Sequence, residues 1–424
     1  MIAVDDKGTW SSGSPRKRAL FFLAAFALTA TLAAVFTELL ATAAFWMTDG
    51  RFISPRTRFA ARANTFQQDL VGNRPCDYVD TLFPHPYLTF VHHANPPCGL
   101  PYVNGEGLFG PEFPPLRRSD RFVVLLTGGS VAAQFAEPLQ HAPTYLESEL
   151  NAHYRSPSGK PFLVLDGGDG SWKQPQQTIL LLLHAHAIDA VVTLDGWNEM
   201  GAFATGSRLE MPQGNFAAAN PLVTDDFAPV AARWAVREAY RRAAQNPIVS
   251  RSNAAYAVVA GAEALLNRVP SRVGARSNTL RSLFAIPPGW SADARWKETV
   301  DTYRFYIRAM HAIAGEMQLL DAYFFQPMPA IDKRLTPDER RVVGDLGYKA
   351  KYEGLVHDLE SLEAEGLPVS GLLDVFASET GTIYSDPVHM VRQSDGSSRG
   401  NLLIAQRISA KIAKAWRLQA VDRR

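Results

Sequence analysis

The sequence predicts an α/β fold: a three-layer α/β/α sandwich on a mainly parallel sheet, preceded by one transmembrane helix and carrying a helical insertion. Two observations predict it. Short runs such as RFVVLL are apolar at nearly every position and alternate with longer segments of helical pattern, which is typical of parallel strands covered on both faces. A long and almost uncharged apolar segment precedes them near the N-terminus.

Composition limits the classes of function. The chain has 424 residues, and 43 Lys and Arg balance 42 Asp and Glu, so the formal net charge of +1 gives no electrostatic reason to bind nucleic acid. Apolar residues make up 46% and charged residues 20%, as in a globular protein that buries a large core. We therefore expect no nucleic-acid partner, and the sequence is silent on oligomeric state.

The apolar segment covers residues 19–46 and contains one charge, Glu38. As a helix these 28 residues would be about 42 Å long. A bilayer core requires only ~20 residues, or about 30 Å. The basic run RKR at 16–18 precedes it, and ATA at 41–43 offers a cleavage site for a signal peptidase. We expect an uncleaved anchor, because the segment exceeds a typical leader: a cytoplasmic tail over 1–18 and a transmembrane helix over 19–47. A cleaved leader remains the alternative.

Residues 48–118 are rich in Arg, Pro, Asn and Gly, which predicts an irregular linker with short extended pieces. The chain's two cysteines, Cys76 and Cys98, lie here without the spacing of a metal site. A structural disulfide is the favoured interpretation, and it implies an oxidising compartment such as a periplasm. Two unpaired thiols in a cytosolic domain are the alternative.

The remaining chain, residues 119–424, is predicted to form one domain. Strand-like runs begin at Arg121 and lie at 161–168, 187–196 and 319–329, with helical patterns between the first three. Residues 201–318 contain helical stretches at 229–245, 253–268 and 292–318, which we interpret as an insertion or lid over the carboxyl edge of the sheet. Further helices are predicted around 336–365 and in the amphipathic segment 401–418.

Polar clusters stand where the predicted strands end, which is where an open parallel sheet places its working residues. They are GGS at 128–130, GGDGSW at 167–172, DGWNE at 195–199 and, near the C-terminus, SDPVH at 385–389. The first cluster alone says little, because a serine after two glycines is also typical of a helix cap.

Taken in order, the four clusters resemble the signature blocks of the SGNH (GDSL-type) hydrolases over about residues 121–415. Ser130 stands in the place of that family's nucleophile, Asn198 in the place of its block-three Asn, and Asp386 with His389 in the place of its DxxH block. The resemblance implies a flavodoxin-like sandwich and esterase, lipase, deacetylase or thioesterase activity. It also implies that His389 is the general base and that Asp386 orients it.

The resemblance further implies an oxyanion hole made by the Ser130 and Gly170 backbone N–H groups and the Asn198 amide. Alignment on the strand would favour Gly168 instead of Gly170; alignment on the helix start favours Gly170, which we choose. The chain departs from the family at Gly129, where Asp is usual, and at Glu199, where Asp is commoner.

Other polar and aromatic residues near these blocks are weaker candidates. Gly168, Trp172 and Trp197 are expected to line the substrate cleft, although packing at a helix start explains Trp172 equally well. His184 and His186 are two positions apart on a predicted helix and cannot share a metal, and His92-His93 has no acidic neighbour in sequence. We expect no metal and no nucleotide cofactor.

Three functions follow from these blocks. The first is an esterase or O-deacetylase on an acylated envelope glycan or a lipid ester, in a single-pass protein of the cytoplasmic membrane whose domain faces the periplasm. The second is an acyltransferase to a glycan hydroxyl through the same site. The third is a non-catalytic glycan-binding or assembly protein, which a long distance between Ser130 Oγ and His389 would favour.

Overall fold

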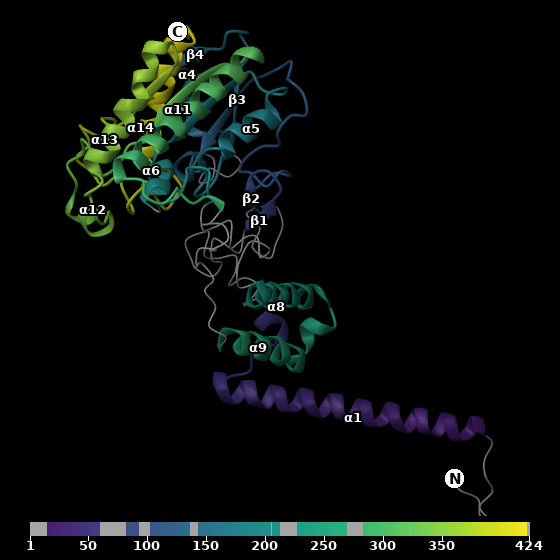
Figure 1. Cartoon of the computed structure of the whole chain (residues 1–424). Helices are drawn as coiled ribbons and strands as arrows, with labels where there is room; N and C mark the ends of the chain where they lie inside the picture. Colours follow the sequence, from purple (N-terminus) through teal and green to yellow (C-terminus); the bar gives the residue numbers. More distant parts are fainter. Residues whose placement is uncertain are drawn as a thin grey trace, which may run out of the picture. The chain divides into compact units, whose positions relative to one another are not determined.

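The computed structural model describes residues 15–59, 82–92, 102–135, 143–204, 206–212, 227–268 and 283–421. The chain divides into two compact units (Figure 1). Unit 1 comprises residues 1–66 and 228–271, and unit 2 comprises residues 67–227 and 272–424. Each unit is described by itself.

Unit 2 is built on a five-stranded sheet in which every pairing is parallel. Its order is β5-β3-β6-β7-β8, which, numbered along the chain, is the doubly wound 2-1-3-4-5 arrangement. In this arrangement the winding reverses between β3 and β6, and ligands bind outside the carboxyl ends of the strands at that point. The strands are β3 (Phe122–Gly128), β5 (Phe162–Gly168), β6 (Ala190–Asp195), β7 (Leu320–Phe325) and β8 (Val369–Gly371).

Side chains alternate between the two faces of the sheet, as the pleat requires. In β3, Val123 and Leu125 belong to one core cluster, whereas Phe122, Val124 and Leu126 belong to the other. All five are buried, because helices cover both faces. This explains why the β3 sequence is continuously apolar instead of alternating with polar residues.

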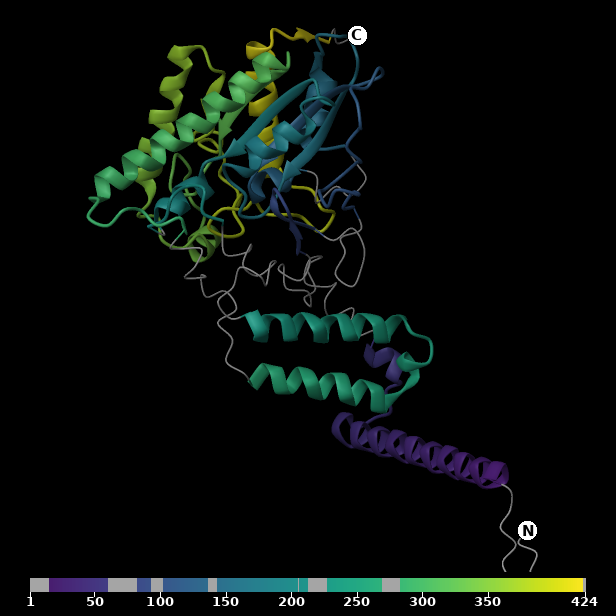
Figure 2. The ribbon, with the colours of Figure 1, turned by 45° about the vertical axis from the view of Figure 1, so that its right-hand side comes forward.

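Helices form the outer two layers (Figures 1 and 2). One face of the sheet packs against α5 (Gln176–His184), α11 (Ala292–Glu316) and α13 (Lys349–Glu360). The other packs against α4 (Tyr145–His153) and the amphipathic α14 (Arg399–Ala415). The predicted three-layer sandwich with a mainly parallel sheet is therefore confirmed. Shorter elements are α3 (Ser130–Ala133), α6 (Trp197–Ala204), α12 (Pro337–Val342), η5 (Ser361–Glu365) and the two-stranded β4 (Tyr154–Arg155) with β9 (Gln419–Ala420).

Part of the predicted linker belongs to the core of unit 2. Strands β1 (Leu82–His85) and β2 (Thr89–His92) form an antiparallel hairpin, and Phe90 is buried in the same cluster as the helix α11 side chains. Leu108 and Phe113 are buried in that cluster too. The described part of residues 48–118 therefore does more than connect. Cys76 and Cys98 lie outside the described residues, and their disulfide stays a prediction.

The predicted insertion over residues 201–318 is divided between the two units. Its three helical stretches correspond to α8 (Phe227–Gln245), α9 (Asn253–Arg268) and α11. Helix α11 packs on the sheet of unit 2, but α9 and nearly all of α8 belong to unit 1. The range is thus not one structural piece, and its role as a lid stays a prediction.

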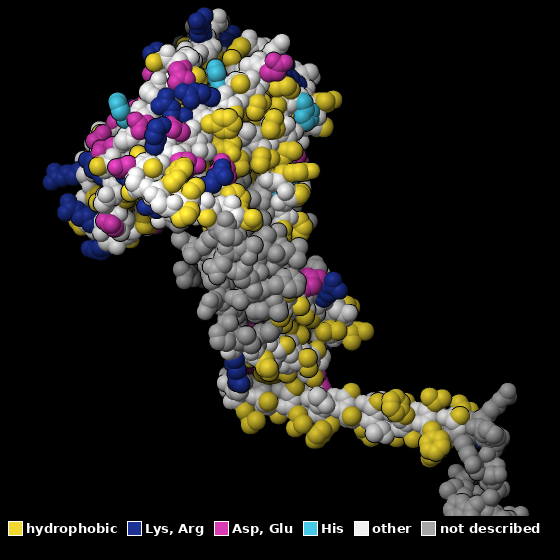
Figure 3. Space-filling view, in the orientation of Figure 1, with side chains coloured by type: hydrophobic (Ala, Val, Ile, Leu, Met, Phe, Trp, Pro, Cys, Tyr) yellow, Lys and Arg dark blue, Asp and Glu magenta, His cyan; other side chains and the backbone are white. Residues whose placement is uncertain are grey.

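Unit 1 contains the apolar N-terminal helix α1 (Pro15–Asp49) together with α8 and α9. The stretch 19–49 of α1 is long and apolar enough to cross a membrane, with a mean hydropathy of 2.3 over an 18-residue window and none of that window buried. Figure 3 shows hydrophobic side chains along this helix. The small core of unit 1 centres on Phe59, Tyr240 and Ala243.

Candidate active site

Ser130 is the first residue of α3, directly after β3 and at the point where the winding reverses. The turn between them needs glycine for a steric reason. A Cβ on Gly128 would lie 2.1 Å from the Leu194 carbonyl oxygen of β6, far inside van der Waals contact. The glycine therefore lets β3 and β6 approach closely and places Ser130 at the carboxyl edge between them.

The Ser130 hydroxyl is paired with a histidine. His389 Nε2 lies 2.7 Å from Ser130 Oγ, although 259 positions separate the two residues. The N-cap of α3 is Gly129, and the cap forms no side-chain hydrogen bond. Ser130 is therefore not the helix cap that its local sequence also allowed.

Asp386 holds His389 from the other side of the ring, with its Oδ2 2.7 Å from Nδ1. Its second oxygen, Oδ1, accepts the backbone N–H groups of Val388 and His389 at 2.8 and 2.7 Å. Burial raises the pKa of this carboxyl, but the hydrogen bonds and charge of His389 and the two backbone donors outweigh it and lower the pKa to about 2. The DxxH spacing thus closes a local turn that orients the imidazole.

A buried ion pair supports the segment that leads into this turn. Lys333 Nζ lies 3.0 Å from Glu339 Oε2, and neither side chain is exposed. Glu339 Oε1 accepts the backbone N–H groups of Ile383 and Tyr384 at 2.8 and 3.1 Å, while Lys333 donates to the Gly381 carbonyl at 3.0 Å. Both charges therefore hold the backbone just before Asp386. Burial raises the pKa of Glu339, but its backbone and Lys333 hydrogen bonds lower it further, below the ordinary value.

Asn198, the second residue of α6, lies against the turn that leads to Ser130. Its Nδ2 donates to the Trp172 carbonyl at 2.8 Å, so one amide hydrogen is used and the second remains to meet a ligand. A Cβ on Gly129 would lie 2.4 Å from Asn198 Nδ2. Position 129 therefore has room only for glycine, because Asn198 occupies the space that a side chain would need.

Glu199 ties the loops on this side together. Its carboxylate is fully buried and accepts the backbone N–H groups of Gly196 at 2.9 Å and Gln174 at 3.2 Å. Burial raises the pKa of Glu199, and it raises that of the neighbouring Asp195. Tyr303 of α11 donates a hydrogen bond to Asp195. The longer Glu side chain thus reaches two loops at once.

Gly168 and Gly170, the two oxyanion candidates in the GGDGSW cluster, have different surroundings. Gly168 ends β5 beneath α3, where a Cβ would lie 2.6 Å from the Ala133 nitrogen, and its N–H donates to Asp166 at 2.8 Å. Gly170 is less buried, and its N–H donates to Asp169 Oδ1, with the nitrogen 2.5 Å from that oxygen. That Asp169 oxygen also lies 2.9 Å from His92 Nε2. The oxyanion role of Gly170 stays a prediction, and it requires the N–H to leave Asp169, which a buried pair with His92 holds in place.

The predicted cleft residues are not equally placed. Trp172 is fully buried against Phe90, with ring centroids 6.4 Å apart, so the cleft prediction for its side chain is wrong: the ring packs in the core and only its carbonyl takes part in the site. Gly168 is likewise buried. Trp197 is partly exposed and packs edge-on to Tyr348 at 4.8 Å, so its cleft role stays a prediction.

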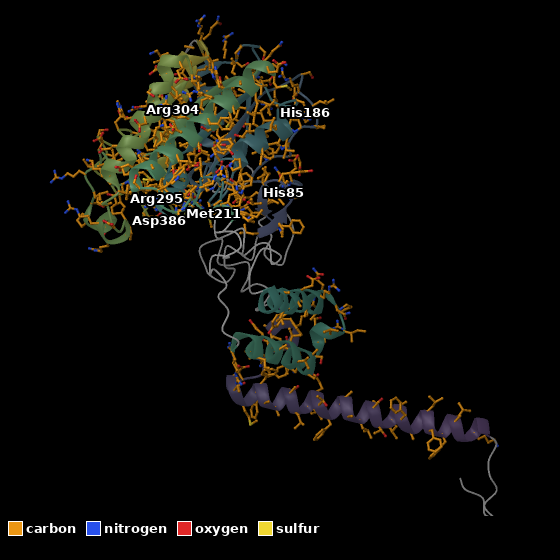
Figure 4. The ribbon with its side chains drawn as sticks, in the orientation of Figure 1. His85, His186, Met211, Arg295, Arg304 and Asp386 are labelled. Carbon is orange, nitrogen blue, oxygen red and sulfur yellow. The ribbon has the colours of Figure 1, made fainter. Side chains whose placement is uncertain are left out.

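The site edge of unit 2 also carries cations. In Figure 4, Asp386 and Arg295 project at the same end of unit 2, whereas His186 and Arg304 lie nearer the other end. Lys351 Nζ lies 3.7 Å from the ring centroid of Phe203 at the end of α6, and Arg295 lies 6.0 Å from the same centroid.

His184 and His186, which the sequence placed two positions apart on a helix, have ordinary partners. His184 pairs with Glu106 at 3.0 Å and packs on Phe113, and His186 lies 3.2 Å from the Pro115 carbonyl. Within the described residues, no group of three or more His, Cys, Asp and Glu side chains is arranged to hold a metal ion.

Sequence reasoning missed three supporting residues. The spacing Thr336-x-x-Glu339 is a capping box at the start of α12, and this local signal could have been found. His92 gave no such signal, because its partner Asp169 lies 77 positions away. Lys333 gave none either, since a lysine in a loop is ordinarily solvated.

Comparison with solved structures returns matches of low identity and low TM-score. A variant of Axe2, an acetyl-xylooligosaccharide esterase from Geobacillus stearothermophilus, matches with a TM-score of 0.35 and 11% identity, over 73% of this chain and 99% of that chain. LAE5, an alpha/beta hydrolase enzyme from the metagenome of Lake Arreo in Spain, matches with a TM-score of 0.33 and 11% identity, over 70% and 97%. No family model and no curated protein matches the chain.

Proposed function

We propose that the chain is a serine-dependent hydrolase of acyl esters of the SGNH type. The observation that carries the proposal is the continuous hydrogen-bonded row from Ser130 Oγ through His389 to Asp386, at the carboxyl edge where the winding reverses. A hydroxyl, an imidazole and a carboxylate in this order are what nucleophilic acyl transfer requires.

The residues divide the reaction as follows. His389 Nε2 takes the proton of Ser130 as Oγ forms a bond with the ester carbonyl carbon, and Asp386 stabilises the imidazolium. His389 then gives that proton to the departing alcohol as the carbon–oxygen bond to it breaks, which leaves an acyl-serine. A water molecule, deprotonated by His389, attacks the acyl carbon, and the proton returns to Ser130 as the carboxylic acid leaves.

The negative charge that develops on the carbonyl oxygen would be met by three donors. These are the N–H of Ser130 at the start of α3, the remaining amide hydrogen of Asn198 and, once it turns away from Asp169 Oδ1, the N–H of Gly170. One such donor commonly stabilises the transition state by about 3 kcal/mol. The 2.7 Å separation of Ser130 Oγ and His389 also argues against the non-catalytic alternative, which required these two groups to lie apart.

The finer proposal concerns substrate and place. We propose an O-acylated envelope glycan or a lipid ester as substrate, with unit 2 on the periplasmic side of the cytoplasmic membrane. Support for the membrane comes from the apolar helix α1, and the periplasmic side rests on the predicted Cys76–Cys98 disulfide. Transfer of the acyl group to a sugar hydroxyl would use the same residues.

The decisive experiment is labelling of the detergent-solubilised chain with a fluorophosphonate, which reacts only with an activated serine. Wild type is expected to label, while Ser130→Ala and His389→Ala lose labelling. Ser361→Ala is the matched control, because Ser361 is exposed and its Oγ bonds the Asp358 carbonyl in a different segment. Unlabelled wild type that is fully folded would overturn the proposal.

A further inference from the structure

The single charge of the apolar segment has partners in a distant helix. Glu38 Oε1 accepts the backbone N–H of Asn253 at 2.6 Å, and Oε2 accepts the N–H of Ala254 at 3.1 Å and the hydroxyl of Ser252 at 2.7 Å. Helix α9 begins at Asn253. The carboxylate of α1 therefore sits on the first turn of a helix more than 200 positions later.

This contact satisfies both partners chemically. The first N–H groups of a helix have no acceptor in their own helix and lie at its positive end, where a carboxylate is favourable. Ser252 serves the ordinary cap role by accepting the N–H of Ala255 at 3.0 Å, and Glu38 takes the donors that remain. A carboxylate in an apolar segment, otherwise out of place, thus has donors for both oxygens.

The partly buried side chains of α1 are grouped around the Glu38 contact. Among the α1 side chains that the structure describes, all are exposed except Glu38, Ala41, Thr42 and Phe45. These positions, spaced by three and four, form one face of a helix. The pattern is that of a helix with one docked partner over its last turns.

Further contacts lie along that face. Asn253 Nδ2 donates to Thr42 Oγ1 at 2.9 Å, and the ring of Phe45 packs edge-on to Tyr256 of α9 at 5.4 Å. Phe59 packs on the same Tyr256 ring at 5.1 Å. Arg58 adds an ion pair to Asp49 at the end of α1. Polar and aromatic contacts thus continue from Glu38 to the end of the helix.

We propose that the α8–α9 insertion is a docking element for the anchor helix α1 and that Glu38 holds the two together. We propose also that α1 is retained in the mature protein. Ala19 to Glu38 is a stretch of about 30 Å, which is the thickness of a bilayer core. The docked turns are those that extend past that length. Cleavage at residues 41–43 would cut inside the docked face and separate Glu38 from α9. This inference does not depend on the proposed hydrolase activity.

The test uses the full-length chain with a C-terminal tag, purified in detergent from a bacterial host. Intact mass gives the N-terminus, and amide hydrogen exchange reports the first turn of α9. Wild type is expected to keep α1 and to protect the amides of Asn253 and Ala254. Glu38→Ala should speed exchange at both amides by about tenfold or more, because their acceptor is lost.

Thr37→Ala is the matched control, because the Thr37 hydroxyl is exposed and bonds only the Ala33 carbonyl of its own helix. It should leave exchange in α9 unchanged. Two outcomes overturn the proposal: a mature N-terminus after residue 43, or Asn253 and Ala254 amides that exchange equally in wild type and Glu38→Ala. If Glu38→Ala does not accumulate, the intact mass of wild type still tests whether α1 is retained. Amide exchange at Asn253 and Ala254 in Tyr256→Ala then tests whether α9 docks on α1. Fluorophosphonate labelling of each variant reports the active serine separately.

Discussion

The two sides of the candidate site hold their carboxyl groups in opposite ways. On the nucleophile side, Asp386 is 43% exposed, and its hydrogen bonds lower its pKa to about 2 despite partial burial. On the donor side, Glu199 is fully buried, and burial raises its pKa although it accepts two backbone N–H groups. The difference shows that two backbone hydrogen bonds do not offset full burial at Glu199, whereas a histidine partner and two backbone donors do offset partial burial at Asp386.

The comparison assigns different work to the two groups. Asp386 touches His389 and must stay ionised to stabilise an imidazolium, so an exposed turn with strong local donors suits it. Glu199 touches backbone, and its role is to position the Gly196 and Gln174 loops around Asn198. Substitutions on the first side should therefore affect the chemistry, and substitutions on the second side should affect geometry.

The largest effect is expected from Asp386→Asn. An amide keeps the shape but no longer stabilises a charged His389, so kcat for a soluble aryl ester should fall on the order of 10⁴-fold with little change in stability. Asp374→Asn is the control, since Asp374 makes only a surface ion pair with Arg407. A loss below tenfold in Asp386→Asn would mean that this carboxylate does not serve the histidine.

A smaller effect is expected on the donor side. Asn198→Ala should lower kcat by about 10²–10³-fold, as removal of one oxyanion donor does elsewhere. Gly129→Ala should produce a comparable loss, because the new Cβ would displace the Asn198 amide.

The control for both is Gly201→Ala, one turn along α6, where a Cβ meets nothing within 4 Å. It should retain activity. If Gly129→Ala is as active as Gly201→Ala, the Asn198 amide is not held where the transition state needs it.

The smallest effect on catalysis, but a large one on stability, is expected from Glu339→Gln. It leaves Lys333 charged and buried, and such a change costs about 3–5 kcal/mol. Denaturant unfolding at neutral pH measures the loss, and kcat of the folded fraction should change little. Asp338→Asn, which affects only an exposed pair with Arg341, is the control.

The pH dependence of this contribution has a defined sign. Because the pKa of Glu339 is lower in the folded chain, its stabilisation is fully present above the unfolded value of about 4.3 and is lost as the pH falls through the lower folded value. Wild type and Glu339→Gln should therefore converge in stability at low pH. A gap that stays constant throughout the acid titration would show that the carboxylate charge is not what stabilises this segment.

Much of the fold could be predicted from the sequence because its signals are local. Continuous apolar runs located β3, β5, β6 and β7, and the DxxH spacing located a turn that is closed by its own backbone. The ends of parallel strands meet at one edge, so Ser130 and Asn198 could be expected together.

The remainder depends on contacts between distant segments. Nothing in the sequence indicates that His92 pairs with Asp169. The charge of Glu38 indicates that an apolar helix needs a polar partner, but it does not indicate that α9 is that partner. Trp172 was misplaced for a similar reason. A tryptophan after a glycine-rich loop suits either a cleft or a core, and the hairpin carrying Phe90 decides for the core.

The boundaries of the two units have a mechanical consequence. Because unit 1 takes residues 1–66 and 228–271, the chain passes between the units three times, near residues 66, 227 and 271. A domain that is joined to its anchor by one chain segment is released by a single proteolytic cut. Here a cut between residues 66 and 82 would leave helix α9 joined to unit 2 and still fastened to α1 through Glu38. The two pieces would stay associated after the cut, and their separation would be governed by the undocking of α9 from α1 instead of by peptide hydrolysis.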